Sequence, residues 1–295
     1  MRPTKALAGR AAVLAAVVIP TMTAAGLFGP PPVAGRTAGP ACVKVYEPGM
    51  LLDPAMHTAG SAMGTPRLRA DLFSGPKAWG MADNLRLRRV AGAPAALVLE
   101  ARLPKGSINP SNHRAPLGGV GFRWAPGLPR GVRAACLTYG LWLPKNFAFN
   151  RGGKLPGLYG GSGPNGGRRA NGVNGFSLRL MWRRGGAGEV YAYIPGHPPG
   201  RGRSIGRGSW KFPRGRWFTV SEEVVLDRPG GRDGALRVWI DGVLRLERRG
   251  VGFRTSPAVT ITGVMAHVFY GGKSPGWAAP ADTVVRFTPF DLRWR

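Results

Sequence analysis

Short segments that alternate apolar and polar residues, separated by glycine- and proline-rich turns, recur through this chain and limit the folds open to it. A β-strand sends successive side chains to opposite faces, so a period of two is typical of a strand with one buried face. The 47 Gly and 28 Pro residues among 295 favour turns between such strands. Few segments follow the 3.6-residue period of a helix. The pattern predicts an all-β protein with two stacked antiparallel sheets, a β-jelly roll or concanavalin-like sandwich.

The alternation is clearest in two neighbouring segments, 176–183 (FSLRLMWR) and 190–194 (VYAYI). Ser177 and Arg179 fall on one face of the first strand, and Tyr191 and Tyr193 share one face of the second. If a five-residue loop joins them as a hairpin, Arg179 lies opposite Tyr193, and Met181 lies opposite Tyr191. We therefore expect Ser177, Arg179 and the two tyrosines to form one patch on an exposed sheet face. An ordinary solvent-exposed face with aromatic cross-strand pairs is the alternative.

A second hairpin and further strands follow the same pattern. Asp241-Gly242 lies between two apolar runs, and an Asp-Gly pair in that position is a strong hairpin signal. The segment 95–101 (AALVLEA) is short and apolar, so it fits either a strand or a helix. The remaining strands are predicted over 217–226, 236–240, 258–262, 265–270 and 284–292.

The N-terminus is typical of an export signal. Three basic residues precede an apolar run over 11–19, and small residues follow it as a cleavage site. The run is shorter than the ~20 residues that a membrane span needs, and no later stretch is long enough. We predict a signal peptide over 1–25, a Pro/Gly-rich linker over 26–40 and one secreted domain over 41–295. A short membrane-anchoring helix is the alternative interpretation of the apolar run.

Cysteine and histidine are scarce, with two Cys and four His in the chain. Cys42 and Cys136 would both survive signal cleavage, and an oxidising compartment would allow them to form a disulfide. Two unpaired buried thiols are the alternative. The small number of ligands excludes a Cys₄ zinc site and most His-rich metal centres, so we expect no metal and no cofactor.

The chain is strongly basic, with 42 Lys and Arg against 14 Asp and Glu and a net charge of +28. The stretch 168–216 alone contains eleven basic residues and one acid, Glu189. Such a field would attract an anionic polymer: nucleic acid, an anionic membrane or an acidic polysaccharide. Because most of the basic residues are Arg, GC-rich coding is an alternative source of part of the charge.

Several familiar motifs fail on closer inspection. Residues 161–166 match G-x-G-x-x-G, but no helical pattern follows, which argues against a dinucleotide site. Glu222 and Glu223 are neighbours on a predicted strand and face opposite sides, so they do not form the paired carboxylates of a glycoside hydrolase. His267 lies in an apolar strand, where a structural histidine is favoured over a ligand.

A series of segments nevertheless resembles one family. The series begins at 152–161 (GGKLPGLYGG) and continues with FSLRLMW, VYAYIP, LRVWIDG and VFYGG. This order and spacing resembles polysaccharide lyase family 14, the alginate and glucuronan lyases with a β-jelly-roll fold, from about residue 102 to residue 292. The resemblance implies an active site made of Lys154, which it places on a loop, together with Ser177, Arg179, Tyr191 and Tyr193. A Gly-rich loop over 160–175 and an Arg-rich insert over 201–207 depart from the family pattern and are expected to affect substrate length or identity.

The chemistry implied by the resemblance suits these residue types. A uronate lyase removes the C5 proton, which becomes acidic when a cation neutralises the adjacent carboxylate. We assign that neutralisation to Arg179, assisted by Lys154. The tyrosine pair is our first choice for base and acid, with Tyr193 favoured because Arg179 would lower its pKa. Lys154 as base, with a pKa lowered by nearby arginines, is the competing assignment. Ser177 would position the substrate or a neighbouring side chain.

Four residues near the family motifs are candidates for sugar binding, namely Tyr159, Tyr270, Lys273 and Trp277. The sequence thus predicts a secreted, monomeric polysaccharide lyase that cleaves β-1,4-linked polyuronates, either alginate (polymannuronate) or glucuronan, by β-elimination. The alternative is a non-catalytic, lectin-like module that binds acidic polysaccharide. A basic protein of nucleic acid or of the cell envelope is a third interpretation, but no segment resembles a nucleic-acid motif, so no nucleic-acid partner is expected.

Overall fold

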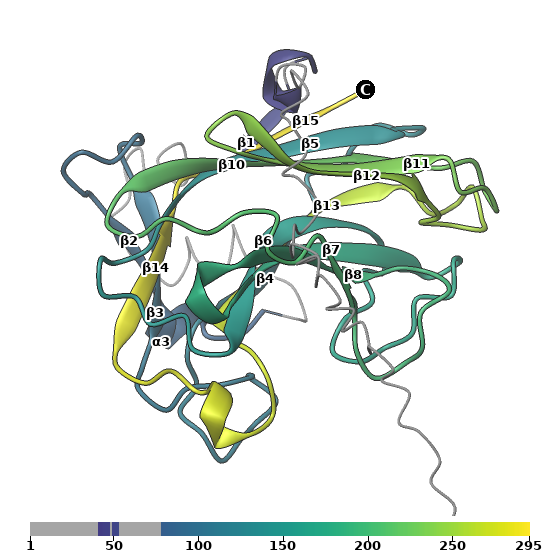
Figure 1. Ribbon diagram of the computed structural model, residues 1–295. Helices are drawn as coiled ribbons and strands as arrows, with labels where there is room; N and C mark the ends of the chain where they lie inside the picture. The colour runs from purple at the N-terminus through teal and green to yellow at the C-terminus, as the bar shows by residue number, and fades with distance from the viewer. Residues whose placement is uncertain (1–40, 48, 53–77) are drawn as a thin grey trace, which may run out of the picture. The chain divides into compact units, whose positions relative to one another are not determined.

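In a computed structural model of the chain, residues 41–47, 49–52 and 78–295 are described. The predicted signal peptide and linker lie outside the described residues. Two antiparallel sheets account for most of the described part (Figure 1), as the alternating pattern predicts. Within the described residues, no helix is long and apolar enough to cross a membrane.

The larger sheet contains nine strands in the described part of the chain. Its path runs β12-β11-β10-β5-β14-β3-β2, and β15 pairs with both β1 and β5. The bounds are β1 Met50–Leu52, β2 Leu85–Arg88, β3 Val98–Leu103, β5 Ala134–Trp142, β10 Trp217–Val225, β11 Gly234–Ile240, β12 Val243–Val251, β14 Thr283–Phe287 and β15 Phe290–Trp294.

The smaller sheet has six described strands in the order β4-β13-β6-β7-β8-β9. They are β4 Val120–Trp124, β6 Gly152–Gly161, β7 Gly175–Arg183, β8 Gly188–Tyr193, β9 Arg203–Ile205 and β13 Ile261–Tyr270. The helical elements are short: η1 Cys42–Lys44, α3 Met81–Asn84, η2 Arg184–Gly186 and η3 Pro275–Trp277.

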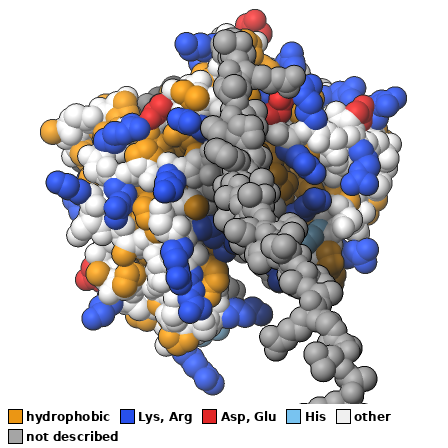
Figure 2. Space-filling model, in the orientation of Figure 1, with side chains coloured by type: hydrophobic (Ala, Val, Ile, Leu, Met, Phe, Trp, Pro, Cys, Tyr) orange, Lys and Arg blue, Asp and Glu red, His pale blue; other side chains and the backbone are white. Residues whose placement is uncertain are grey.

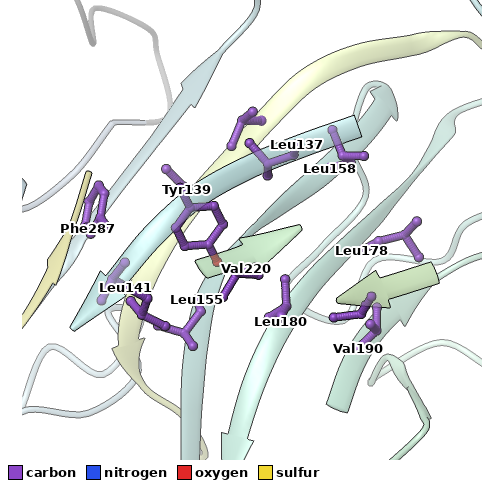
Figure 3. Packing of buried hydrophobic residues seen from close by; sticks show 14 of the residues in the cluster. Leu137, Tyr139, Leu141, Leu155, Leu158, Leu178, Leu180, Val190, Val220 and Phe287 are labelled. Carbon is purple, nitrogen blue, oxygen red and sulfur yellow. The ribbon is translucent and has the colours of Figure 1, made fainter. Parts of the chain in front are cut away.

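The hydrophobic core lies between the two sheets (Figure 3). Leu178 and Leu180 of β7 point into it from the smaller sheet, while Leu137 and Val220 enter from the larger sheet. Trp182, predicted to face inward by alternation, is fully buried. The opposite face of the smaller sheet is therefore free to carry polar residues.

The predicted hairpin between β7 and β8 forms, but its register differs by two residues from the prediction. Arg179 lies opposite Tyr191 rather than Tyr193, and Tyr193 lies opposite Ser177. The cause is a tighter turn, in which Arg183 N–H donates to the carbonyl of Ala187. A shift of two residues keeps each side chain on its face, whereas a shift of one would reverse it. The four residues therefore still share one face of the sheet.

Other segments also differ from expectation. Residues 258–260 of one predicted strand lie outside the sheets, and its end joins the strand predicted over 265–270 in one continuous strand, β13. The strand predicted over 284–292 is interrupted at Thr288-Pro289 to give β14 and β15. The ambiguous segment 95–101 contributes to a strand, β3. The Lys154 segment, expected as a loop, is the strand β6. The Asp241-Gly242 hairpin forms between β11 and β12 as predicted.

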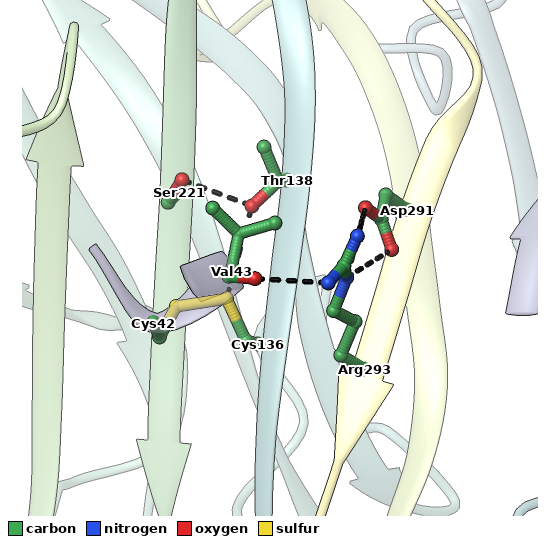
Figure 4. Close-up of polar contacts among 7 residues, drawn as sticks. All are labelled: Cys42, Val43, Cys136, Thr138, Ser221, Asp291 and Arg293. Atoms are coloured by element: carbon green, nitrogen blue, oxygen red, sulfur yellow. Dashed lines mark hydrogen bonds and ion pairs between the residues drawn. A yellow bond between two sulfur atoms is a disulfide. The ribbon is translucent and has the colours of Figure 1, made fainter. Parts of the chain in front are cut away.

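A disulfide joins Cys42 to Cys136 across 94 residues of sequence (Figure 4). Cys136 lies on the face of β5 that points away from the sandwich core, where it packs with Tyr46 and Trp239 in a second, smaller cluster. Beside it, Arg293 donates to the carbonyl of Val43 and pairs with Asp291. The bridge therefore fastens the N-terminal segment to the outer side of the larger sheet.

Candidate active site

A groove of about 980 Å³ lies on the outer face of the smaller sheet. Strands β6, β7, β8 and β13 form its floor, and loops around 109–117, 165–167, 200–201 and 271–277 form its walls. Among the described residues, the lining includes Lys, Arg, His, Tyr and Trp side chains but no Asp or Glu. The groove is thus lined by basic and aromatic side chains and lies on the outer face of the smaller sheet.

Lys154 enters the groove because β6 contains a bulge. The register of β6 shifts between Lys154 and Gly157 against both neighbouring strands. Leu155 and Leu158 consequently both point into the core, although strict alternation would place them on opposite faces. The bulge thereby puts Lys154 on the same face as the residues of β7 and β8 that line the groove.

The Lys154 amine is buried and lacks a carboxylate partner within the described part of the chain. Its Nζ lies 3.2 Å from the centre of the Tyr191 ring and 2.8 Å from Met181 Sδ. Burial, and then the charges of Arg179 and Arg183, hold the pKa of Lys154 well below its usual value, while Glu189 acts weakly in the opposite direction. This environment favours the neutral amine, which is the form that accepts a proton.

Arg179 carries a buried charge that no described carboxylate neutralises. Its Nη1 lies 3.1 Å from His267 Nδ1, and its Nε has no described partner. Burial lowers the pKa of Arg179 to about 10, so the guanidinium stays charged at neutral pH. An uncompensated buried cation is costly, and an anion bound in the groove would offset that cost.

His267 lines the groove and has a ring N–H without a described partner. Burial and the charges of Arg179, Arg123 and Lys154 hold its pKa well below the usual value, so the ring is neutral. A guanidinium can only donate, so Nδ1 must accept from Arg179, and the ring proton resides on Nε2. Among the described residues Nε2 has no partner. Sequence analysis had favoured a structural histidine here, but His267 lines the groove.

Tyr191 and Tyr193 pack edge to face, with ring centres 5.9 Å apart. Their hydroxyls each accept a backbone N–H at 3.0 Å, from Gly202 and Gly167 respectively. Burial raises the pKa of Tyr193, and the lowering by Arg179 is a smaller effect. The expectation that Arg179 lowers this pKa overall was therefore wrong, because the prediction from alternation gave the face but not the depth of burial.

Two loops meet over the tyrosines. Gly200 N–H donates to the carbonyl of Gly167 at 2.9 Å, which ties the loop between β8 and β9 to the Gly-rich loop after β6. Gly167 and Gly200 line the groove, and so does Arg201, the first residue of the Arg-rich insert. The two segments that depart from the family pattern are thus part of the groove wall.

Arg183 and Glu189 form an ion pair at the turn end of the hairpin. The fully buried Glu189 carboxylate accepts from Arg183, Ser204 and Arg207. Burial acts to raise the pKa of Glu189, but these three hydrogen bonds outweigh it and lower the pKa. Glu189 does not line the groove, and its carboxylate pairs with Arg183 and Arg207 instead of with Lys154 or Arg179.

The structure brings most of the predicted site together. The groove is lined by Lys154, Arg179, Tyr191, Tyr193, Lys273 and Trp277. Ser177 is fully buried instead, and its hydroxyl donates to the carbonyl of Pro164 at 2.6 Å. It therefore fixes the Gly-rich loop and does not reach the groove.

Two of the residues predicted to bind sugar, Tyr159 and Tyr270, lie outside the groove. Tyr270 is a core residue that packs on Phe147 and Trp182, and its hydroxyl donates to a backbone carbonyl. Tyr159 is buried beneath Arg123, whose guanidinium lies 5.0 Å from its ring centre. Neither lines the groove. These two residues were chosen because they lie near family motifs in the sequence, and that proximity does not indicate whether a side chain is buried.

The residue that the sequence analysis undervalued is His267. It alternates along β13 with Val264, Ala266 and Val268, which are all in the core. Strand alternation alone would have placed His267 on the groove face, opposite those three residues. The alternation that places His267 on the groove face is already present in the strand predicted over 265–270.

The fold and the groove together define a jelly-roll protein with a site for an extended, anionic ligand. Comparison with known proteins gives the same class: a model of the polysaccharide lyase 14 family matches residues 92–290. The chain therefore belongs to the polysaccharide lyase 14 family, and it is a polysaccharide lyase. No curated protein matches it in a sequence comparison.

Solved structures of lyases share the fold. The alginate lyase of family 14 from Aplysia kurodai is 30% identical, with a TM-score of 0.65 over 74% of this chain and 90% of that one. The alginate lyase vAL-1 from Chlorella virus is 22% identical, with a TM-score of 0.66 over 84% and 100%. An endo-β-1,4-glucuronan lyase from Trichoderma reesei is 10% identical, with a TM-score of 0.50 over 74% and 87%.

Proposed function

We propose that this lyase cleaves β-1,4-linked polyuronates by β-elimination in the groove. One observation carries the proposal: Arg179 is a buried cation with no carboxylate partner among the described residues, and the buried amine of Lys154 beside it has none either. A polymer with one carboxylate per sugar would supply the missing anions along the groove. A neutral glycan would leave the guanidinium of Arg179 buried and unpaired.

The residues suit an elimination with separate base and acid. Arg179 and the Nε2–H of His267 would hold the uronate carboxylate and stabilise the enediolate that forms when C5 loses its proton. Lys154, kept neutral by burial, would accept that proton at Nζ. The C4–O4 bond then breaks as C4=C5 forms, and the Tyr193 hydroxyl gives its proton to the leaving O4. The ammonium and tyrosinate return to their starting forms by proton exchange with solvent.

The two pKa directions carry this assignment. A lowered pKa makes Lys154 a base near neutral pH, and a raised pKa keeps Tyr193 protonated as the acid. Titratable groups with pKa values displaced in opposite directions are typical acid and base pairs. The proposal therefore adopts the competing sequence assignment for the base, Lys154, and keeps Tyr193 for the acid. Tyr191 would hold the Lys154 amine against its ring.

The substrate class is tested with a panel of polymers. Purified protein is incubated with polymannuronate, polyguluronate, glucuronan and a neutral β-1,4-glucan, and the ultraviolet absorbance of the unsaturated uronate product is followed. The relatives named as alginate and glucuronan lyases make the first three polymers the natural choice. We expect a rise with at least one polyuronate and none with the glucan. Binding to a polyuronate without any rise would support the lectin-like alternative.

We also propose that the protein is exported, since residues 1–25 read as a signal peptide. Expression of the full chain in a bacterial host, followed by N-terminal sequencing of the exported protein, tests this. A mature N-terminus within the small residues before position 26 is expected. Retention of the intact N-terminus inside the cell would contradict export.

A further inference from the structure

Glu222 is a buried carboxyl that the proposed reaction does not use. It lies on β10, on the face that points into the core, in line with Val220 and Val224. It is fully buried; Oε2 accepts the backbone N–H of Leu158 at 2.7 Å, and Oε1 has no described partner. A carboxyl in the middle of a sandwich is costly, so its place requires an explanation.

The explanation lies in the bulge of β6, directly across the core. Pro156 within the bulge has no N–H, and its carbonyl accepts a hydrogen bond from the Tyr139 hydroxyl at 3.1 Å. Tyr139 points inward from β5 (Figure 3), where it lies opposite Val220 of the neighbouring strand β10, two residues before Glu222. Two polar side chains of the larger sheet thus reach across to backbone groups of Pro156 and Leu158. Buried backbone groups that leave a ladder need such partners.

Gly157 is confined by the neighbouring strand β7 of its own sheet and by Glu222 of the opposite sheet. A Cβ on this residue would lie 1.9 Å from the carbonyl oxygen of Leu178 and 2.9 Å from Glu222 Oε2. Only glycine leaves room for the carboxyl to reach the Leu158 N–H. Glycine, proline and the buried carboxyl therefore act as one local arrangement, and Lys154 immediately precedes it.

We propose that Glu222, with Tyr139, is a positioning residue that holds the β6 bulge and thereby directs Lys154 into the groove. The inference rests on the proposed role of Lys154 as the base. Without the bulge, alternation from Leu158 would return position 154 to the core face. Neither Glu222 nor Tyr139 lines the groove, so each acts through the backbone of β6.

The carboxyl acts in its neutral form. Burial raises the pKa of Glu222 well above its usual value, and the hydrogen bond from Leu158 opposes this only in part. A neutral amide can offer the same acceptor, so Glu222→Gln is expected to keep the arrangement. Glu222→Leu removes the acceptor while keeping an apolar side chain of similar size.

Kinetics on the polyuronate substrate distinguish positioning from general stability. A misplaced catalytic group can cost about 100-fold in rate, so Glu222→Leu is expected to lower kcat by about that factor with little change in KM. Glu222→Gln should retain kcat and the wild-type pH profile. Val224→Ala, a core truncation on the same strand and face, is the matched control and should lower thermal stability while leaving kcat unchanged.

A second measurement stands independently of any activity. Hydrogen exchange of the Leu158 amide should be slow in the wild type and in Glu222→Gln, and faster in Glu222→Leu. Tyr139→Phe, which removes only a hydroxyl, replaces the Leu variant if that variant does not fold, and should lower kcat without raising KM. Unchanged exchange in Glu222→Leu, or a kcat loss equal to that of Val224→Ala, would overturn the inference. An inactive wild type with the expected exchange pattern would count against the proposed function alone.

Discussion

Lys154 and Tyr193 lie in the same groove, yet burial displaces their pKa values in opposite directions. The reason is the charge of the disfavoured form: burial disfavours an ammonium and a phenolate alike, so it lowers the first pKa and raises the second. Burial in one groove therefore favours both the neutral amine of Lys154, which can act as a base, and the protonated hydroxyl of Tyr193, which can act as an acid. The buried charge of Arg179, without a described carboxylate, reserves the same place for an anion.

The pH dependence of the rate follows from these two directions. The rate should rise with pH as Lys154 loses its proton, at a pH well below the usual lysine pKa of 10.5. It should fall again only above the usual tyrosine pKa of 10.0, where Tyr193 ionises. Removal of a general base costs about 10²–10⁴-fold, so Lys154→Ala should lower kcat by that order. Lys154→Arg should be inactive across the range, since arginine does not deprotonate.

Steady-state rates of the wild type from acid to alkaline pH, beside the two Lys154 variants, provide the check. A wild-type rate that shows no rise with pH below the usual pKa of lysine would contradict Lys154 as the base. Full activity in Lys154→Arg would contradict it as well.

Substitution of Arg183 tests the direction in which nearby charges shift the pKa of Lys154. Its charge lowers the pKa of Lys154, after burial and Arg179. Arg183→Gln removes that repulsion and takes one of two arginine partners from the Glu189 carboxylate, and both changes raise the pKa of Lys154. The acid limb of the rate profile should therefore move to higher pH. Arg216→Gln, an equal charge change in an exposed ion pair, is the control and should not move it; a shift to lower pH in Arg183→Gln would refute the account.

For single residues, the sequence predicted which face of a strand a side chain occupies, but it did not predict how deeply that side chain is buried. Alternation placed Arg179, Tyr191 and Tyr193 on one face, which the hairpin confirms. It could not show that Ser177 is covered by the loop at Pro164, because burial by a distant loop leaves no local pattern. Tyr270 sits at the end of a strand in sequence but points inward, where Phe147 stacks on it.

Among the elements, β6 was the hardest to predict. Its segment GGKLPGLYGG contains five glycines and a proline, residues that are rare in strands, and the family resemblance placed it on a loop. Tertiary contacts supply what its composition lacks: β7 and β13 pair with it on both sides. The bulge itself depends on groups from the opposite sheet, which no local pattern reveals.

The connection between β8 and β9 is a further element with a testable role. A Cβ on Gly202 would lie 2.7 Å from the Tyr191 ring and 2.9 Å from the Tyr193 ring. Because Gly202 is itself buried, Gly202→Ala should displace the tyrosines and lower both kcat and thermal stability. Pro199→Ala, an exposed change in the same loop, should leave kcat unchanged. Equal rates for both variants and the wild type, measured with thermal melting, would show that the loop does not position the tyrosines.

Over the whole molecule, positive charge is spread rather than confined to the groove. Figure 2 shows Lys and Arg side chains over the visible face, with few acidic residues among them. The net charge of +28 would draw an anionic polymer toward the protein and make association sensitive to salt. The groove adds selection, because the guanidinium of Arg179 is buried there without a described carboxylate partner.

The disulfide belongs to this scale as well, since it joins residues 94 positions apart on the side of the larger sheet away from the core. Loss of a bridge that closes a loop of this length costs about 2–5 kcal/mol of stability. A Cys42→Ser/Cys136→Ser variant should lose about that amount in guanidinium unfolding and keep its kcat, because the bridge is remote from the groove. Equal stability with and without the cysteines would show that the bridge does not contribute.

The most direct test of the central claim is the mass of the cleaved ends. Oligosaccharides released from a polyuronate by the wild type are analysed by mass spectrometry beside the products of Lys154→Ala. Elimination leaves an unsaturated sugar at each new non-reducing end, lighter by one water than the end that hydrolysis would leave. We predict unsaturated ends from the wild type and almost no product from the variant. Saturated ends, or the same yield from Lys154→Ala, would contradict β-elimination at this site.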